Sequence, residues 1–246
     1  MSAAKITGTP LEVYDEYKKA NGFAHPDRKK IGKVAELASG YGGWIGAWKN
    51  FGADMPDDEI KAQILAWREA SPEIVEMWGG EYKWAGPGKW DYKHELHGLE
   101  GCAMQAIMYP GYEFRHTDIG YFVADDILFC RLPSGRFLHY HSPRLVPTED
   151  KLRRGPAHSI TFMGYNSNAT KGPVGWMRQE TYGGRLFENV VQAVARDIQA
   201  EALVRVEQAG YPVVMHTHDE ACAEVPIDPR YNVDHMCQVM AQNPTW

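Results

Sequence analysis

Long hydrophobic runs and paired cysteines are both missing from this chain. Its longest apolar stretches fall well short of the roughly 18 residues that a membrane-spanning helix needs, and its opening residues lack the apolar core of a secretory signal. The cysteines are scattered, with no C-x-x-C pair that would indicate a zinc knuckle or a disulfide framework: Cys102, Cys130, Cys222 and Cys237. We therefore expect no membrane partner and a location in a reducing cytoplasm.

An excess of positive charge, internal repeats and low-complexity segments are missing as well. The chain carries 26 Lys and Arg against 32 Asp and Glu, for a formal net charge of -6. This balance weighs against a free-standing nucleic-acid-binding protein, which is usually basic, but it leaves a local basic face open. With 246 residues and 44% hydrophobic content, the chain is long enough for one large globular domain or two small ones.

Hydrophobic periodicity predicts helices in the first third of the chain. Asp27 follows a proline as a plausible N-cap, and apolar residues then recur at helical spacing, which predicts a helix over 27–49 with a glycine-rich end. Residues 57–79 are expected to be helical in two pieces, broken at Ser71-Pro72. The stretch 79–101 is rich in glycine and aromatic residues, and its pattern assigns no element to it.

Strand and helix signals alternate in the remainder. Apolar runs on both sides of the Pro133-Ser134-Gly135 turn predict a hairpin over 125–141, and we expect 141–180 to be mostly irregular. Within residues 185–209, the apolar residues recur at helical spacing and form one stripe, which predicts a long amphipathic helix. That helix leads into a second predicted hairpin over 211–226.

The second hairpin has an unusually polar tip, with His216, His218, Asp219 and Glu220 within five positions. One interpretation is a solvated turn, because charge at a hairpin tip is common. The other is a metal site, because imidazole and carboxylate groups are what divalent cations bind.

The first predicted helix carries a second candidate site. Lys29, Lys33, Leu37 and Tyr41 are four residues apart and would form one slowly turning ridge. Paired cations suit a triphosphate, and an aromatic ring suits the flat face of a base. Ordinary solvated lysines and a core tyrosine are the plain alternative. Glycines next to the tyrosine would let a ligand approach closely: Gly40, Gly42 and Gly43.

Taken together, these motifs resemble those of the family A (polymerase I-like) DNA polymerases. The pattern K-x7-Y-G, from Lys33 to Tyr41-Gly42, resembles the motif B of that family, and HDE at 218–220 between two apolar strands resembles its motif C. Between them, in the order of the family, "RLPSGRFLHY" is similar to a hairpin with a G-R core, and "LFENVVQAVARD" is similar to the helix that enters motif C. The resemblance covers about residues 27–246 and is of the phage and prophage type.

An α+β fold follows from the resemblance, as a fragment of the right-hand polymerase fold. The expected parts are a lead-in over 1–26, helical fingers over 27–184 and part of an antiparallel-sheet palm over 185–246. The fingers would include an insertion near 80–120 and a hairpin. The palm part includes the long helix and the motif C hairpin.

The resemblance also implies roles for single residues. Asp219 would be catalytic and bind metal, Glu220 would assist it, and His218 would lie near the primer end. Lys33 would contact the phosphates of the incoming nucleotide, while Tyr41 would lie at the nascent base pair. Further nucleotide contacts are implied for Arg28, Lys29, Leu37 and Gly42, and further DNA contacts for Arg136, Asn189 and Gln192.

Two substitutions depart from the family pattern. Lys29, with Arg28 beside it, stands where the family has an arginine, so the charge is kept but the bidentate geometry is lost. Leu37 stands where several members carry an aromatic residue that packs against the nucleotide sugar. Sugar discrimination therefore does not follow from the resemblance.

The largest departure is the lack of a motif A strand, of the type D-x-S-x-x-E, upstream of motif B. Nucleotidyl transfer by two metal ions needs that second aspartate, yet only 26 residues precede Asp27, and no thumb or exonuclease sequence is found. The resemblance therefore implies the C-terminal subunit of a split polymerase, in the bacterial host cytoplasm if phage-encoded. Expected partners are primer-template DNA, dNTPs, two Mg²⁺ ions and an N-terminal chain with thumb and motif A. A further piece that supplies the last palm strand is left open.

Two other classes of function stay open at this point. A chain with half a metal site could be a non-catalytic DNA-binding or assembly subunit. A metallohydrolase could use His216 and His218 as zinc ligands, although only His235 follows them as a further histidine.

Overall fold

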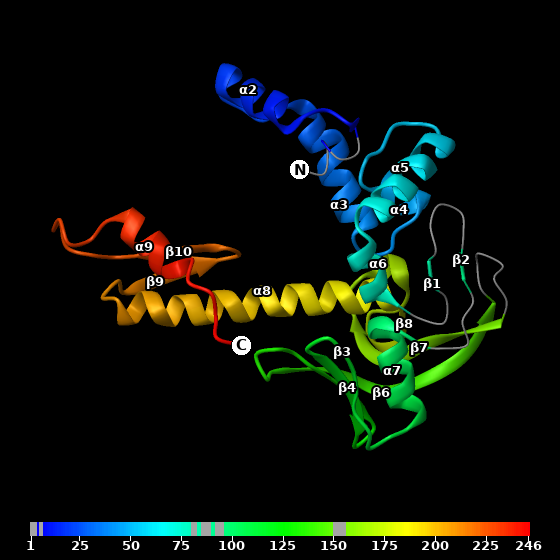
Figure 1. Cartoon of the computed structure of the whole chain (residues 1–246). Coiled ribbons are helices and arrows are strands. Elements are labelled where there is room, and N and C mark those ends of the chain that lie inside the picture. Colours follow the sequence, from blue (N-terminus) through cyan, green and yellow to red (C-terminus); the bar gives the residue numbers. More distant parts are fainter. Residues whose placement is uncertain (1–3, 5–6, 80–82, 85–89, 92–95, 150–155) are drawn as a thin grey trace. The chain divides into compact units, whose positions relative to one another are not determined.

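The structure is a computed structural model that describes residues 4, 7–79, 83–84, 90–91, 96–149 and 156–246. The chain divides into two compact units, the first made of Met1–Arg131 with Phe137–Glu188 and the second of Leu132–Arg136 with Asn189–Trp246. Helices and an antiparallel sheet make up an α+β fold (Figure 1). No helix among the described residues is both long and apolar enough to cross a membrane.

Short helices build the N-terminal part of the first unit. They are α2 (Leu11–Asn21), the π-helix η1 (Arg28–Lys33), α3 (Val34–Ser39), α4 (Ile45–Asn50), α5 (Asp57–Ala70) and α6 (Pro72–Trp78). The predicted break at Ser71-Pro72 is confirmed, because Pro72 begins α6, where its missing N–H costs no helical hydrogen bond. The core beneath these helices contains Trp48, Ile60, Ile64, Trp67 and Trp78.

The continuous helix predicted over 27–49 is wrong in two respects. Its first turn is the π-helix η1, and the helix ends at Ser39 before α4 starts at Ile45. The glycines explain the break: Gly42 has a left-handed backbone with φ of 77°, and a side chain at Gly43 would overlap the carbonyl of Ala38. The glycine-rich end is thus a turn between two helices.

A six-stranded antiparallel sheet forms the rest of the first unit, in the order β3-β4-β5-β6-β7-β8. Its strands are β3 (Phe114–His116), β4 (Ile119–Ala124), β5 (Ile127–Arg131), β6 (Phe137–Glu149), β7 (Pro156–Asn166) and β8 (Gly175–Thr181). The predicted hairpin over 125–141 is confirmed, because β5 and β6 pair with each other as its two strands. The prediction that 141–180 is mostly irregular is wrong, because β6 continues to Glu149 and β7 and β8 follow, with a short 3-10 turn η2 (Ala169–Lys171) between them.

Helix α7 (Gly98–Met108) packs on one face of this sheet. The strand residues beneath it are buried, among them Tyr121, Leu128, Cys130, Tyr140 and Ile160. Burial raises the pKa of Cys102 to about 11 and that of Cys130 to about 12, so both thiols stay protonated at neutral pH. The stretch 79–101, to which no element was assigned, contains the two-residue strands β1 (Lys83–Trp84) and β2 (Trp90–Asp91) and the start of α7, and much of it lies outside the described residues.

The second unit holds the predicted long helix and the predicted second hairpin, both confirmed. Helix α8 (Gly183–Gln208) runs into it from the first unit, followed by β9 (Val213–Thr217), β10 (Glu220–Ala223) and α9 (Val233–Met240). Its small core is formed by Val206, Tyr211 and Val239, with Val213, Ala223 and Met236 packed against it.

The turn between β5 and β6 belongs to this second unit, because it is bound to α8. Ser134 Oγ donates to Asp197 Oδ2 at 2.6 Å, and Arg136 Nε donates to Asp197 Oδ1 at 2.7 Å. Arg136 Nη2 also donates to the carbonyl of Ala193 at 3.1 Å. A single carboxylate on α8 thus fixes the turn Leu132–Arg136 within the second unit.

Candidate metal and nucleotide site

The hairpin β9–β10 presents its polar tip as a two-residue turn. Thr217 pairs with Glu220, so His218 and Asp219 are the two turn residues, and His218 has a left-handed backbone with φ of 48°. Such a conformation is several-fold more frequent for histidine than for most residues, and it suits a tight hairpin turn. The turn places Asp219 between two hydrogen-bonded strands.

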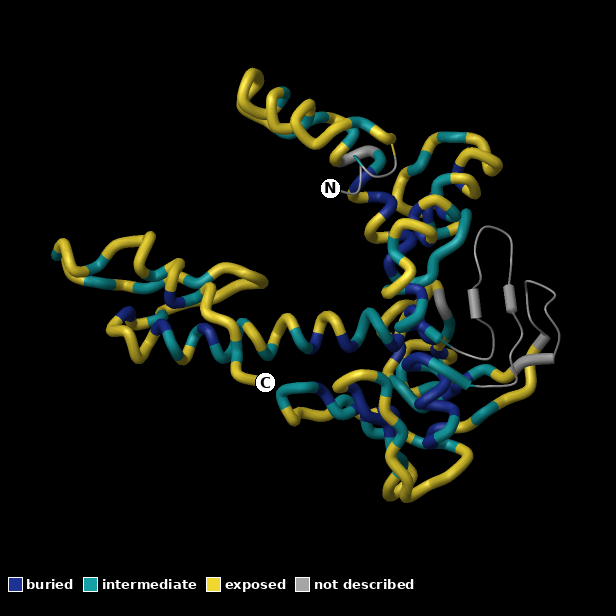
Figure 2. Tube along the Cα trace, in the orientation of Figure 1, coloured by how far each residue is buried: buried dark blue, intermediate teal, exposed yellow. Residues whose placement is uncertain are grey.

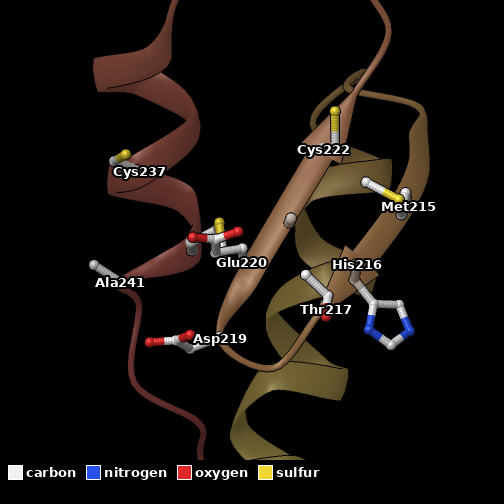
Figure 3. Close-up of a pocket in the computed structure, with 10 residues that line it drawn as sticks. Met215, His216, Thr217, Asp219, Glu220, Cys222, Cys237 and Ala241 are labelled. Carbon is white, nitrogen blue, oxygen red and sulfur yellow. The ribbon is translucent and has the colours of Figure 1, made fainter.

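The two carboxylates lie on one side of the hairpin, facing α9. In Figure 3, Asp219 and Glu220 lie on the side of Cys237 and Ala241, and His216 points away from them. An open pocket of about 710 Å³ lies here, lined by the hairpin and by α9. Strand pairing agrees with the view, since Glu220 shares a face with Thr217, and His216 shares the opposite face with Ala221.

Asp219 and Glu220 are exposed, as is most of the hairpin (Figure 2). Within the part of the chain that the structure describes, neither carboxylate makes an ion pair or a side-chain hydrogen bond. Oxygen ligands of this kind suit Mg²⁺, which binds through one or two carboxylates and takes its other ligands from water and phosphate. The donor chemistry of this tip therefore fits a Mg²⁺ ion, with part of its coordination supplied from elsewhere.

The histidines do not assemble a zinc site. His216 is exposed, and the strand alternation that would put His218 on the same face as His216 ends at the left-handed turn. No group of three His, Cys, Asp or Glu side chains close enough to hold a metal ion is found among the described residues. The geometry thus gives the hydrolase interpretation no support.

Tyr41, in the first unit, lies in the turn that follows α3. Its ring is half-buried and contacts Phe187 at 6.4 Å between centroids, in the first turns of α8. A side chain at Gly184 would overlap the carbonyl of Tyr41, so the glycine allows the two backbones to touch. Burial first, then the charges of Glu188 and Glu36, raise the pKa of Tyr41, so its hydroxyl stays neutral.

Indole and guanidinium groups hold the segment around Tyr41. Trp48 Nε1 donates to Ser39 Oγ at 2.9 Å, and Trp78 Nε1 donates to the carbonyl of Gly40 at 3.0 Å. The buried Arg68 donates to the carbonyls of Gly42 and Gly43, both at 3.4 Å. Its guanidinium carbon lies 5.1 Å from the ring centre of Trp44 and 5.5 Å from that of Trp78. These residues were not predicted from the sequence, although the concentration of tryptophan in 44–78 was a signal.

We expect Arg68→Met to lower the free energy of unfolding by about 2 to 4 kcal/mol, because the carbonyls of Gly42 and Gly43 lose a charged donor and two indole rings lose a cation. Urea denaturation would measure the change. Arg185→Met is the matched control, since this exposed arginine also lies over a ring, at 5.9 Å from that of Tyr182. Equal effects of the two substitutions would contradict a special role for Arg68.

The residues predicted to bind the triphosphate lie on η1 and α3. Lys33 and Leu37 are exposed and Arg28 is exposed one turn earlier, whereas the side chain of Lys29 lies outside the described set. The single ridge expected from α-helical spacing is altered, because η1 is a π-helix and Tyr41 follows the end of α3. Lys33 and Leu37 are therefore the pair that remains on one exposed surface.

The residues predicted to bind DNA are distributed over α8 and the β5–β6 turn. Gln192 is exposed on α8 and Asn189 is half-buried one turn before it. Arg136 is held by Asp197 and Ala193, which makes it an anchor of the turn in addition to any DNA contact.

Comparison with known proteins finds similarity to a phage DNA polymerase. The DNA polymerase of Bacillus phage SP02 is 33% identical to this chain over 248 aligned residues. The alignment covers 100% of this chain and 33% of that relative, so the chain spans a third of the length of the protein it resembles. No protein-family model matches the chain, and no solved structure matches it.

Proposed function

We propose that this chain is the fingers and part of the palm of a family A-like, DNA-directed DNA polymerase of phage type. The observation that carries the proposal is the exposed pair Asp219 and Glu220 at the tip of a tight hairpin, in a chain that is similar along its whole length to a phage DNA polymerase. The order of the motifs supports it, since Lys33 and Tyr41 precede the helix α8, which precedes the hairpin.

In this proposal, each group acts according to its position. Asp219, with help from Glu220, would hold Mg²⁺, which supplies neutralisation of the attacking and leaving oxygens during in-line displacement. Lys33 would bind the phosphates of a dNTP as a point charge. Tyr41 would offer a neutral ring to the nascent base pair, and Gln192 and Asn189 would contact the primer-template, with His218 near the primer end.

A second chain completes the site in this proposal. Two adjacent carboxylates cannot supply the two-metal geometry by themselves, so the second aspartate would come from a motif A strand on an N-terminal polymerase chain that also carries the thumb. Exposure of the hairpin supports an added strand: β9 and β10 form a two-stranded sheet, and Val214 and Met215 are 59% and 61% exposed. Open strand edges next to exposed apolar side chains favour pairing with another chain.

Reconstitution tests the proposal. The purified chain should show no primer extension alone, and Mg²⁺-dependent extension should arise when it is mixed with a chain that carries the thumb and motif A of a phage polymerase. Robust extension by the chain alone would overturn the split-subunit part of the proposal. A mixture that forms a stable complex but never extends a primer would instead identify a non-catalytic assembly subunit.

A further inference from the structure

The six-stranded sheet has a second face, opposite α7, that differs in composition from the buried one. Strand pairing puts Gly120, Arg131 and Phe137 in one row of this face, and Phe122, Phe129 and His139 in the next. A third row runs through Ile127, His141, Met163 and Arg178. Because directly paired residues point to the same side of a sheet, these side chains share one surface. We call it the open sheet face.

Aromatic rings cover part of the open sheet face. Phe122 and Phe129 are stacked with centroids 5.0 Å apart, and the ring of Phe137 lies edge-on to both, at 5.8 and 5.9 Å. The ring of His139 lies edge-on to Phe129 at 5.0 Å. The phenylalanines thus pack against one another and form one aromatic cluster on the first strands of this face.

Two of those rings are exposed side by side. Tyr165 on β7 pairs directly with Trp176 on β8, and they are 60% and 63% exposed. His141 lies edge-on to Trp176, with centroids 5.9 Å apart. Large exposed rings on a sheet offer faces on which planar groups can stack.

A fixed positive charge lies beside these rings. Arg178, two residues after Trp176, donates to the carbonyl of Ser142 and to Thr161 Oγ1, both at 3.1 Å. These acceptors are neutral oxygens that orient the guanidinium, and the carboxylate of Asp126, which is paired with Arg144, also lies within electrostatic range of it. Arg115 pairs with Gly120 in β4 and adds a second exposed arginine to the same face, with no carboxylate bound to it among the described residues. By contrast, Arg131 and Arg144 are paired with Glu113 and Asp126.

We propose that the open sheet face binds single-stranded nucleic acid. Bases would stack on Trp176 and Tyr165, and a backbone phosphate would be bound by Arg178. Aromatic side chains on the face of an antiparallel sheet, next to cations that follow the backbone, are a recurrent way to hold an unpaired strand. Arg178 and Arg115 put positive charge on this face of a chain whose net charge is -6, which favours a polyanion over a protein surface. The inference goes beyond nucleotide incorporation and does not depend on it.

Fluorescence anisotropy with a labelled mixed-sequence DNA oligonucleotide and the full chain tests this inference without any nucleotide. Trp176→Ala should weaken binding about tenfold, as expected for the loss of one stacked base. Arg178→Met should reduce the slope of log affinity against log salt concentration by about 0.7, the value for one phosphate contact on a single strand. Phe23→Ala is the matched control, because Phe23 is 58% exposed and lies outside the sheet.

Circular dichroism and urea denaturation of each variant would show whether the sheet is still folded, and Tyr165→Ala would serve as a second variant if Trp176→Ala unfolds. Blunt duplex DNA should bind more weakly than the single strand. The proposal is overturned if the folded wild-type chain does not bind the oligonucleotide at low salt, or if Phe23→Ala weakens binding as much as Trp176→Ala. It is also overturned if the open sheet face instead mediates self-association that Trp176→Ala abolishes. Primer extension by the reconstituted polymerase is a separate measurement, so its failure would leave this result intact.

Discussion

Asp219→Asn should lower nucleotide incorporation by the reconstituted polymerase about a thousandfold or more. The substitution removes a negative oxygen ligand at the position proposed to hold Mg²⁺, and a loss of about 4 kcal/mol of transition-state stabilisation corresponds to a thousandfold in rate. Folding should be unaffected, because Asp219 is exposed, forms no ion pair within the described chain, and lies in a turn that asparagine also tolerates. Single-turnover extension at saturating dNTP would measure the loss directly.

The neighbouring residues provide the controls for this experiment. His216→Gln should leave measurable synthesis, since the imidazole lies on the opposite face of the hairpin from Glu220. Glu220→Gln should give an intermediate loss, as expected for an assisting carboxylate. Sedimentation and DNA anisotropy should show that all three variants still join the partner chain and bind primer-template. Incorporation that survives in Asp219→Asn but is lost in His216→Gln, together with zinc bound tightly by the lone chain, would reverse the assignment in favour of a hydrolase.

The elements that the sequence predicted well are those specified by local signals. Pro72 marks the start of α6 by its own backbone geometry, and Gly135 marks the turn between β5 and β6 with φ of 83°. Helix α8 was found because one apolar stripe runs along it over many turns. Each of these signals is contained within a few neighbouring residues, so no knowledge of the remaining fold is needed to interpret it.

The missed elements depend on contacts between distant parts of the chain. In β8, the exposed positions hold Trp176 and Arg178 and an inward position holds Gln179, so apolar and polar residues do not alternate visibly. β8 is a strand because it pairs with β7, and this pairing is not visible in its local sequence. Helix α7 was missed for the opposite reason: it is buried around most of its circumference, and its apolar residues show no one-sided period.

The candidate site shows the same division. Asp219 and Lys33 are predicted by motif, because short spacings at a turn and along a helix are visible in the linear sequence. Arg68 was not predicted, because its role depends on two carbonyls 25 and 26 residues away in the sequence and on the rings of Trp44, just before α4, and Trp78, at the end of α6. Positioning residues of this kind carry no motif, and only the packed structure assigns them to the turn that holds Tyr41.

Lys33→Ala should raise the KM for dNTPs about ten- to a hundredfold in the reconstituted polymerase and leave the affinity for primer-template nearly unchanged. A hydrogen bond to a charged group is worth about 1.5 to 3 kcal/mol, and each 1.4 kcal/mol is a factor of ten in affinity. Lys33 is exposed at the end of η1 and forms no ion pair within the described chain, so its charge is available to a triphosphate. Alanine is a good helix former, so the helix should persist.

Two further lysine variants separate a phosphate contact from a general effect of charge. Lys33→Arg should retain much of the nucleotide affinity, because a positive charge remains at the same position. Lys49→Ala should leave the KM unchanged, because this exposed lysine of the same unit is already paired with Asp57. Steady-state titration of dNTP gives the KM, and anisotropy without nucleotide gives the DNA affinity. If Lys33→Ala weakened DNA and nucleotide binding equally, Lys33 would face the nucleic acid rather than the triphosphate, and the assignment of this surface would have to change.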